Sequence, residues 1–150
     1  ANLGATIANR GYFITPHIVK EIQDNQLDSI YRTPRYTTIE KRHYESVVEG
    51  MRGAATGGTC RMLSVMVPDL EACGKTGTAQ QNTLHPNHAY FLSYGPYENP
   101  KISVSCVIPN GYTSTYAMEC ARDVYKYYFG GKKLSGGKAT SVAHYAGTND

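Results

Sequence analysis

The sequence predicts an α/β fold in which helices pack on an antiparallel sheet of at least three strands. The strand-like segments 71–81, 88–95 and 101–108 follow one another through short links, as in an antiparallel meander. Segments 37–51 and 115–129, before and after the meander, carry apolar residues at helical spacing. A hydrophobic fraction of 41% is enough to form a core around these elements.

The N-terminal part is predicted to hold the end of a helix and two short strands. Residues 2–10 place apolar side chains on one helical face, and Gly11 is a typical helix stop. Residues 16–22 and 27–32 are strand-like runs on either side of the turn-forming residues 23–26. We therefore expect a hairpin before the second helix.

The second helix is marked by Thr37 and Glu40, which stand at the spacing of a capping box. Its stripe at helical spacing is Ile39, His43, Val47, Val48 and Met51. Gly57–Gly58 breaks the helix. A short apolar stretch at 62–67 and a turn at Pro68–Asp69 then lead to the strands.

The three strands are separated by the loop 82–87 and by a tight turn at 98–100. In the third strand Ile102, Val104, Cys106 and Ile108 alternate with Lys101, Ser103 and Ser105, as expected for a sheet with two different faces. The last helix has an apolar stripe made of Ala117, Cys120, Ala121, Val124 and Tyr128. Together these elements predict one folded unit over residues 1–129.

Residues 130–150 are rich in Gly, Ser, Lys and Thr, and we predict a mostly disordered tail there. The first residues have no initiating methionine and resemble the interior of a domain, so we expect the chain to be part of a longer protein. The sequence shows neither a signal peptide nor an apolar run of membrane-spanning length.

Charge and cysteine content limit the function classes. A formal net charge of +3 without a dense basic stripe argues against nucleic-acid binding. The four cysteines, Cys60, Cys73, Cys106 and Cys120, are widely spaced and form no C-x-x-C pair, so both disulfides and buried free thiols stay open. His85 and His88 flank a proline turn without a Cys or carboxylate partner, so we predict no metal site, and no cofactor.

Residues 74–80 read GKTGTAQ, which combines a lysine, two threonines and two glycines in one predicted strand. Glycine weakens a strand interior unless another backbone must approach closely. Thr76 and Thr78 would share a face with Gly74, while Lys75 adds a positive charge beside them. The pattern indicates a strand against which a peptide-like ligand docks.

With its context, this motif resembles the C-terminal part of a penicillin-binding protein transpeptidase domain. GKTGTAQ is followed by HAYFLSYGP, ENPKISVSCVI and a final helix, and ATIANRGYFITPHIVKEI and VVEGMRGA also resemble stretches upstream of the motif. The resemblance covers residues 1–129 and is greatest to the monofunctional class B enzymes that serve cell elongation. It implies the three-layer transpeptidase/β-lactamase-like fold.

The resemblance implies a serine acyl-enzyme mechanism on D-Ala-D-Ala stem peptides, which β-lactams mimic. Lys75 would supply positive charge, the hydroxyls of Thr76 and Thr78 would bind the substrate carboxylate, and Gly77 would admit the substrate backbone. The backbone N–H of Thr78 would be one oxyanion-hole donor. Ala79 would complete the β-lactam-binding strand.

The chain departs from the family pattern because it carries one of three catalytic elements. The only S-x-x-K match is Ser135 to Lys138, which follows the motif and contains two glycines, and no S-x-N occurs. Asn99 in Tyr97-Glu98-Asn99 belongs to a turn. We therefore expect this piece alone to be inactive and its exposed apolar surface to drive self-association.

The resemblance places the parent protein at the periplasmic face of the cytoplasmic membrane, held by an N-terminal anchor and working with cell-wall synthesis proteins. Three other functions stay open at this stage. They are a β-lactam sensor, a non-catalytic scaffold of the cell-wall machinery, and a D,D-carboxypeptidase or β-lactamase with the same motifs.

Overall fold

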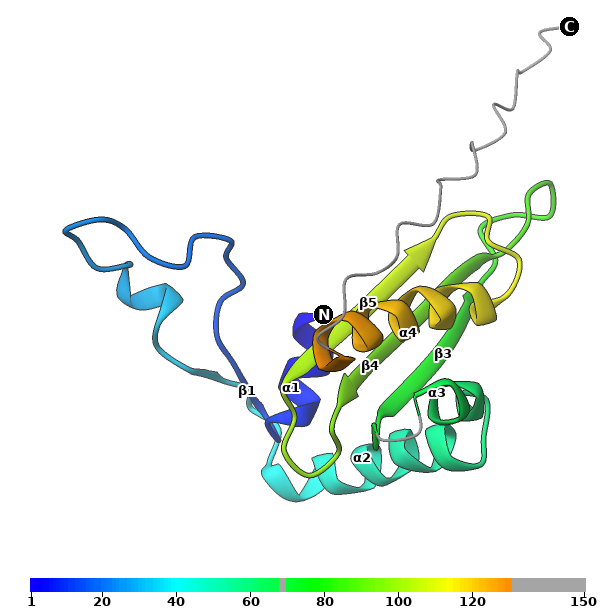
Figure 1. Cartoon of the computed structure of the whole chain (residues 1–150), viewed down its shortest axis with the longest axis horizontal. Helices are drawn as coiled ribbons and strands as arrows, with labels where there is room; N and C mark the ends of the chain where they lie inside the picture. The colour runs from blue at the N-terminus through cyan, green and yellow to red at the C-terminus, as the bar shows by residue number, and fades with distance from the viewer. Residues whose placement is uncertain (68–69, 131–150) are drawn as a thin grey trace, which may run out of the picture.

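The computed structural model describes residues 1–67 and 70–130, and its elements form three layers (Figure 1). The central layer is an antiparallel sheet in the order β3-β4-β5, made of Cys73–Ala79, His88–Gly95 and Ile102–Ile108. Helix α4 (Ser114–Gly130) crosses one face. The predicted α/β fold with an antiparallel sheet of at least three strands is confirmed. Of the predicted tail at 130–150, Gly130 is the last residue of α4, and residues 131–150 lie outside the described residues, as does the predicted turn at 68–69.

One core lies between the sheet and α4. It contains Phe91 and Ala89 of β4 and four buried residues of the helix, Ala117, Met118, Ala121 and Tyr125. The apolar set of β5 packs against this core, as its alternation predicts. The helix stripe differs from the prediction, since Met118 and Tyr125 are buried while Val124 and Tyr128 are about half exposed.

A second, smaller core lies on the face of the sheet away from α4, near one end. Here α1 (Asn2–Ala8) and α2 (Lys41–Thr56) pack and form the third layer. It joins Ile7 and Ala8 of α1 to Val48 of α2 and to Cys73 and Tyr94 of the sheet. Helix α2 turns toward the sheet through Tyr44, Val48, Met51 and Ala55, whereas the predicted Ile39 and Val47 are exposed.

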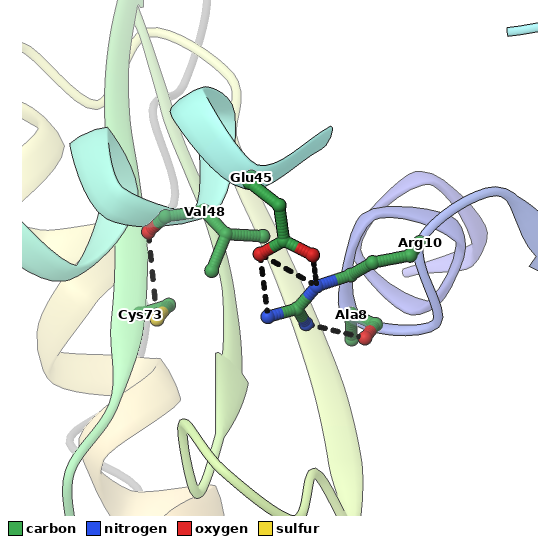
Figure 2. Close-up of polar contacts among 5 residues, drawn as sticks. All are labelled: Ala8, Arg10, Glu45, Val48 and Cys73. Atoms are coloured by element: carbon green, nitrogen blue, oxygen red, sulfur yellow. Dashed lines mark hydrogen bonds and ion pairs between the residues drawn. The ribbon is translucent and has the colours of Figure 1, made fainter. Parts of the chain in front are cut away.

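Polar contacts tie these two helices together (Figure 2). The Arg10 guanidinium, just after α1, pairs with Glu45 of α2 at 3.3 Å and donates a hydrogen bond to the carbonyl of Ala8 at 2.8 Å. On the sheet side, the Cys73 thiol lies 4.0 Å from the carbonyl of Val48. These contacts fix α2 against the first residues of β3.

The predicted capping box at Thr37 and Glu40 is wrong. Helix α2 begins at Lys41 with Glu40 as its N-cap, and no side chain caps it. The Thr37 hydroxyl instead hydrogen-bonds the phenol of Tyr44 at 2.7 Å. A buried tertiary partner has replaced the local cap.

The predicted strands at 16–22 and 27–32 are also wrong. Two short strands, β1 (Tyr12–Phe13) and β2 (Arg35–Tyr36), pair with each other, and the chain between them forms an arm that projects away from the sheet (Figure 1). The arm, defined as residues 14–34, contains the 3-10 turn η1 (Ser29–Tyr31) and one isolated bridge, Ile22 to Asn25. Within the part of the chain that the structure describes, the arm residues pair with neither the β1–β2 pair nor the three-stranded sheet.

The apolar stretch at 62–67 forms a short helix, α3 (Arg61–Met66). Leu63 is fully buried in the core under α4, while Met62 is exposed, so only part of this apolar stretch contributes to the core. A compact turn, residues 57–60, connects α2 to α3 and brings the chain back to the edge of the sheet. None of the helices in the described part of the chain is long and apolar enough to cross a bilayer.

Candidate active site

The GKTGTAQ motif lies on β3, which is an edge strand of the three-stranded sheet. Its register with β4 runs from Cys73 opposite Tyr94 to Ala79 opposite His88. Exposure rises along the strand, since Cys73 and Gly74 are buried while Thr78 and Ala79 are exposed. The second half of the strand is therefore open to a ligand.

The two faces of β3 carry different chemistry. Gly74 and Thr76 lie opposite Ser93 and Phe91, which are buried on the α4 side of the sheet. Thr78 shares this face by alternation, and Lys75 and Gly77 lie on the other face. A ligand at the strand edge can reach the hydroxyls from one side and the ammonium group from the other.

Lys75 and Thr76 are held by neighbouring polar groups. The exposed Lys75 ammonium donates to the carbonyl of Thr76 at 2.6 Å. The Thr76 hydroxyl donates to the hydroxyl of Thr59 at 3.0 Å, which ties the motif to the turn between α2 and α3. The lysine keeps further N–H donors for a ligand, because an ammonium group has three.

Cys60, in the same turn, shows which way the backbone of β3 points. Burial raises the pKa of the Cys60 thiol, and hydrogen bonds from Thr59 and from the backbone of Thr76 partly offset this. The Thr76 N–H therefore faces the turn, away from β4. Alternate residues of a strand aim their N–H groups at the same edge, so the Thr78 N–H also points outward, where the strand is exposed.

A hollow of about 320 Å³ lies on the lysine side of the strand. Lys75 and Gly77 of β3 and Tyr90 and Leu92 of β4 form its floor, and Leu3 of α1 lies at its rim. A Cβ added at Gly77 would lie 3.2 Å from the Tyr90 Cβ, so a side chain there would crowd this floor. Because Gly77 has no side chain, the hollow stays open beside Lys75.

The structure places the predicted residues Lys75, Thr76, Gly77, Thr78 and Ala79 on one continuous strand, and their binding roles stay predictions. Sequence reasoning missed Thr59, Cys60 and Tyr90 as their neighbours. The Gly57–Gly58 pair before Thr59 was the available signal, because two glycines allow a tight turn that can approach a strand.

Both ring nitrogens of His88 have hydrogen-bond partners within the protein. Its Nε2 lies 3.1 Å from the side-chain oxygen of Gln81, and its Nδ1 accepts the backbone N–H of Asn110 at 2.9 Å. Within residues 1–67 and 70–130, no group of three or more His, Cys, Asp and Glu side chains is arranged to hold a metal ion.

The fold of the chain is shared with solved structures of penicillin-binding proteins. Pseudomonas aeruginosa PBP2, solved in complex with WCK 5153, matches with a TM-score of 0.72 and 29% identity, over 84% of this chain and 28% of that chain. Penicillin-binding protein A of Mycobacterium tuberculosis, solved as an imipenem acyl-enzyme complex, matches with a TM-score of 0.70 and 25% identity, over 85% and 29% of the two chains.

Sequence comparison defines the family. The peptidoglycan D,D-transpeptidase MrdA of Haemophilus influenzae is 31% identical over 144 residues, which cover 81% of this chain and 22% of that enzyme. The family model described as the penicillin binding protein transpeptidase domain matches residues 1–126, so the chain belongs to this family. It spans less than a quarter of the length of the curated relatives it matches, at 22%, 20% and 23%.

Proposed function

We propose that these residues form the K-T-G wall of a peptidoglycan D,D-transpeptidase that cross-links stem peptides through a serine acyl-enzyme. The observation that carries the proposal is the exposed second half of β3, where strand alternation aims the Thr78 N–H away from β4 and the Lys75 ammonium group on the same strand is exposed. A peptide that adds to this edge as a further strand would meet both groups together.

In the proposed reaction, a serine hydroxyl attacks the carbonyl carbon of the D-Ala-D-Ala bond and the terminal D-Ala leaves with the proton from the serine. The amine of a second stem peptide then attacks the ester and releases the serine. The Thr78 N–H stabilises the oxyanion in both steps, and such a donor contributes about 2.7–4 kcal/mol to lowering a barrier. The hydroxyls of Thr76 and Thr78 bind the substrate carboxylate, and Lys75 supplies positive charge near that carboxylate and to the network of groups that transfers the serine proton.

The nucleophile in this proposal comes from outside the 150 residues. The only S-x-x-K match, Ser135 to Lys138, follows the motif and contains two glycines, which disfavour the helix that places serine and lysine on one face. We place the reaction on the outer side of the cytoplasmic membrane, where the stem peptides are, and the support for this is that curated relatives are named peptidoglycan D,D-transpeptidases.

Labelling with a fluorescent penicillin tests the proposal in the full-length protein. The wild type should form a covalent adduct, and Lys75→Ala should lower the labelling rate by about 10²–10⁴-fold, as expected for a group in the proton-transfer network. Lys101→Ala, at an exposed lysine before the far edge strand, is the matched control and should label like the wild type. A full-length protein that forms no adduct at all would overturn the proposal.

A second assay separates transpeptidation from hydrolysis and sensing. A D-Ala-D-Ala peptide is supplied with and without an amine acceptor, and the release of D-Ala and the formation of the cross-linked product are measured. A transpeptidase makes the cross-linked product, a carboxypeptidase only releases D-Ala, and a sensor keeps its acyl group without turnover.

A further inference from the structure

Two cysteines lie on the two elements that meet where α4 packs on β5. Cys106 lies opposite Phe91 in the register of the sheet, and it packs against the core under α4. Cys120 lies on α4, three residues after Ala117 and one before Ala121, and both alanines are buried against the sheet. The topology brings the two thiols to the same helix-to-strand contact.

The buried residues of α4 nearest to Cys120 are Met118 and Ala121, and Ala117 lies about one turn before it, so this turn of the helix packs on the sheet beside β5. Cys106 packs against the same core that contains Ala117 and Ala121 of α4, which places it at the turn of the helix that carries Cys120. Burial raises the pKa of the Cys106 thiol, and the neighbouring Cys120 thiol raises it further. Both cysteines are free in the structure.

We propose that Cys106 and Cys120 form a disulfide bond that ties helix α4 to strand β5. The pair is accessible, since Cys120 is exposed and Cys106 is partly exposed. The other two cysteines are fully buried and belong to different cores, Cys60 under α4 and Cys73 beside α2. They do not compete for the pairing and should stay reduced.

The chemistry requires a small disulfide as the oxidant, of which oxidised glutathione is an example. The exposed Cys120 thiolate attacks one sulfur of the oxidant, forming a mixed disulfide and releasing one glutathione thiolate. The Cys106 thiolate then attacks the Cys120 sulfur and releases the second glutathione. The protein loses two electrons and two thiol protons, and the oxidant becomes two glutathione thiols.

The test uses the full-length protein in a glutathione buffer, followed by alkylation and digestion with trypsin. The cleavage sites at Lys101 and Arg122 place both cysteines in one peptide, residues 102–122. We expect this peptide to lose both alkylation sites under oxidising conditions and to recover both after reduction. Cleavage after Met118, which lies between the two cysteines, should give two pieces that stay joined until a reductant is added.

Single variants control the test. Cys106→Ser should leave Cys120 carrying one glutathione, and Cys120→Ser, at an exposed position, should leave Cys106 open to alkylation. The oxidised wild type should melt at a higher temperature than the reduced protein, and both variants should lose this difference. The proposal is overturned if both thiols alkylate fully in the oxidising buffer, or if each carries its own glutathione without a cross-link.

Discussion

The two glycines of the motif have different neighbours, although both lie on β3. A Cβ at Gly74 would lie 2.9 Å and 3.1 Å from two ring atoms of Phe91, whose side chain is buried in the main core. A Cβ at Gly77 would lie 3.2 Å from the Cβ of Tyr90, on the side of the open hollow. One glycine makes room for the core, and the other makes room beside the lysine.

Gly74→Ala and Gly77→Ala should therefore separate stability from activity. We expect Gly74→Ala to lower the free energy of unfolding by about 1–3 kcal/mol, because the Phe91 ring cannot move out of a packed core. Gly77→Ala should lower the free energy of unfolding by only about 0.5 kcal/mol, but it should slow penicillin labelling because the added methyl group enters the hollow beside Lys75. Urea unfolding and labelling rates of the two variants check this, and equal losses of stability would contradict it.

The residues of the motif strand could be predicted from the sequence, but the residues that contact them in the fold could not. Lys75 and both threonines follow from the pattern GKTGTAQ, because strand alternation is a local rule. The contact between Thr76 and Thr59 joins residues 17 positions apart, and it depends on how the turn after α2 folds back to β3. No local spacing encodes such a contact.

Helix α4 shows the same limit for a whole element. Its existence and approximate ends follow from the sequence, and Ala117 and Ala121 of the predicted stripe are buried, but Cys120, Val124 and Tyr128 of that stripe are exposed. The structure buries Tyr125, whose phenol donates to the Ser93 hydroxyl at 2.8 Å inside the core. With tyrosines at three of four consecutive positions, apolar periodicity alone cannot choose the face, and the buried Ser93 partner decides it.

Neighbouring tyrosines of α4 provide a matched test of this assignment. Tyr125→Ala should lower the free energy of unfolding by about 3–5 kcal/mol, because it removes a fully buried ring from the main core. Tyr128→Ala, at 54% exposure, should change the free energy of unfolding by about 0.5 kcal/mol or less. Chemical denaturation measures both, and a larger loss at Tyr128 would restore the stripe predicted from the sequence.

The projecting arm is the element that local patterns predicted least well. Ile18 and Val19 favour a strand by composition, yet Ile18 is fully exposed and no neighbouring strand pairs with it. Strand propensity describes how a residue fits a half-buried sheet, so it has little effect where no sheet is in reach. The sheet at 73–108 was predictable because its strands pair with neighbours in the sequence.

At the scale of the whole molecule, buried acidic groups set the response to alkaline pH. Burial raises the pKa of Cys60 and Cys73 above the ordinary 9.0, and that of Tyr94 and Tyr125 above the ordinary 10.0. The unfolded chain then releases protons at a pH where the folded chain still holds them. Stability is complete below the unfolded-state pKa values and is lost as pH rises above them.

We expect the free energy of unfolding to fall as pH rises above about 9, where first the cysteines and then the tyrosines of the unfolded chain lose their protons, by up to about 1.4 kcal/mol per pH unit for each group. Tyr125→Phe should cost about 1 kcal/mol at neutral pH, because it removes the hydrogen bond to Ser93, but should make the alkaline decline shallower. Tyr127→Phe, at an exposed position, is the control. The free energy of unfolding of both variants is measured by urea unfolding across this pH range. The same loss of stability with rising pH in Tyr125→Phe and Tyr127→Phe would contradict this account.

The contact between α1 and β5 has a consequence for the order of events during synthesis. Gly4 of α1 lies directly against Ser103, whose hydroxyl also donates to the carbonyl of Ala1 at 2.9 Å. A helix of seven residues is too short to persist alone in water. A ribosome adding about 5–20 residues per second needs roughly 5–20 seconds to synthesise the residues from α1 to β5. We therefore expect the α1 segment to stay unfolded during this time, because the strand that it packs against has not yet been made.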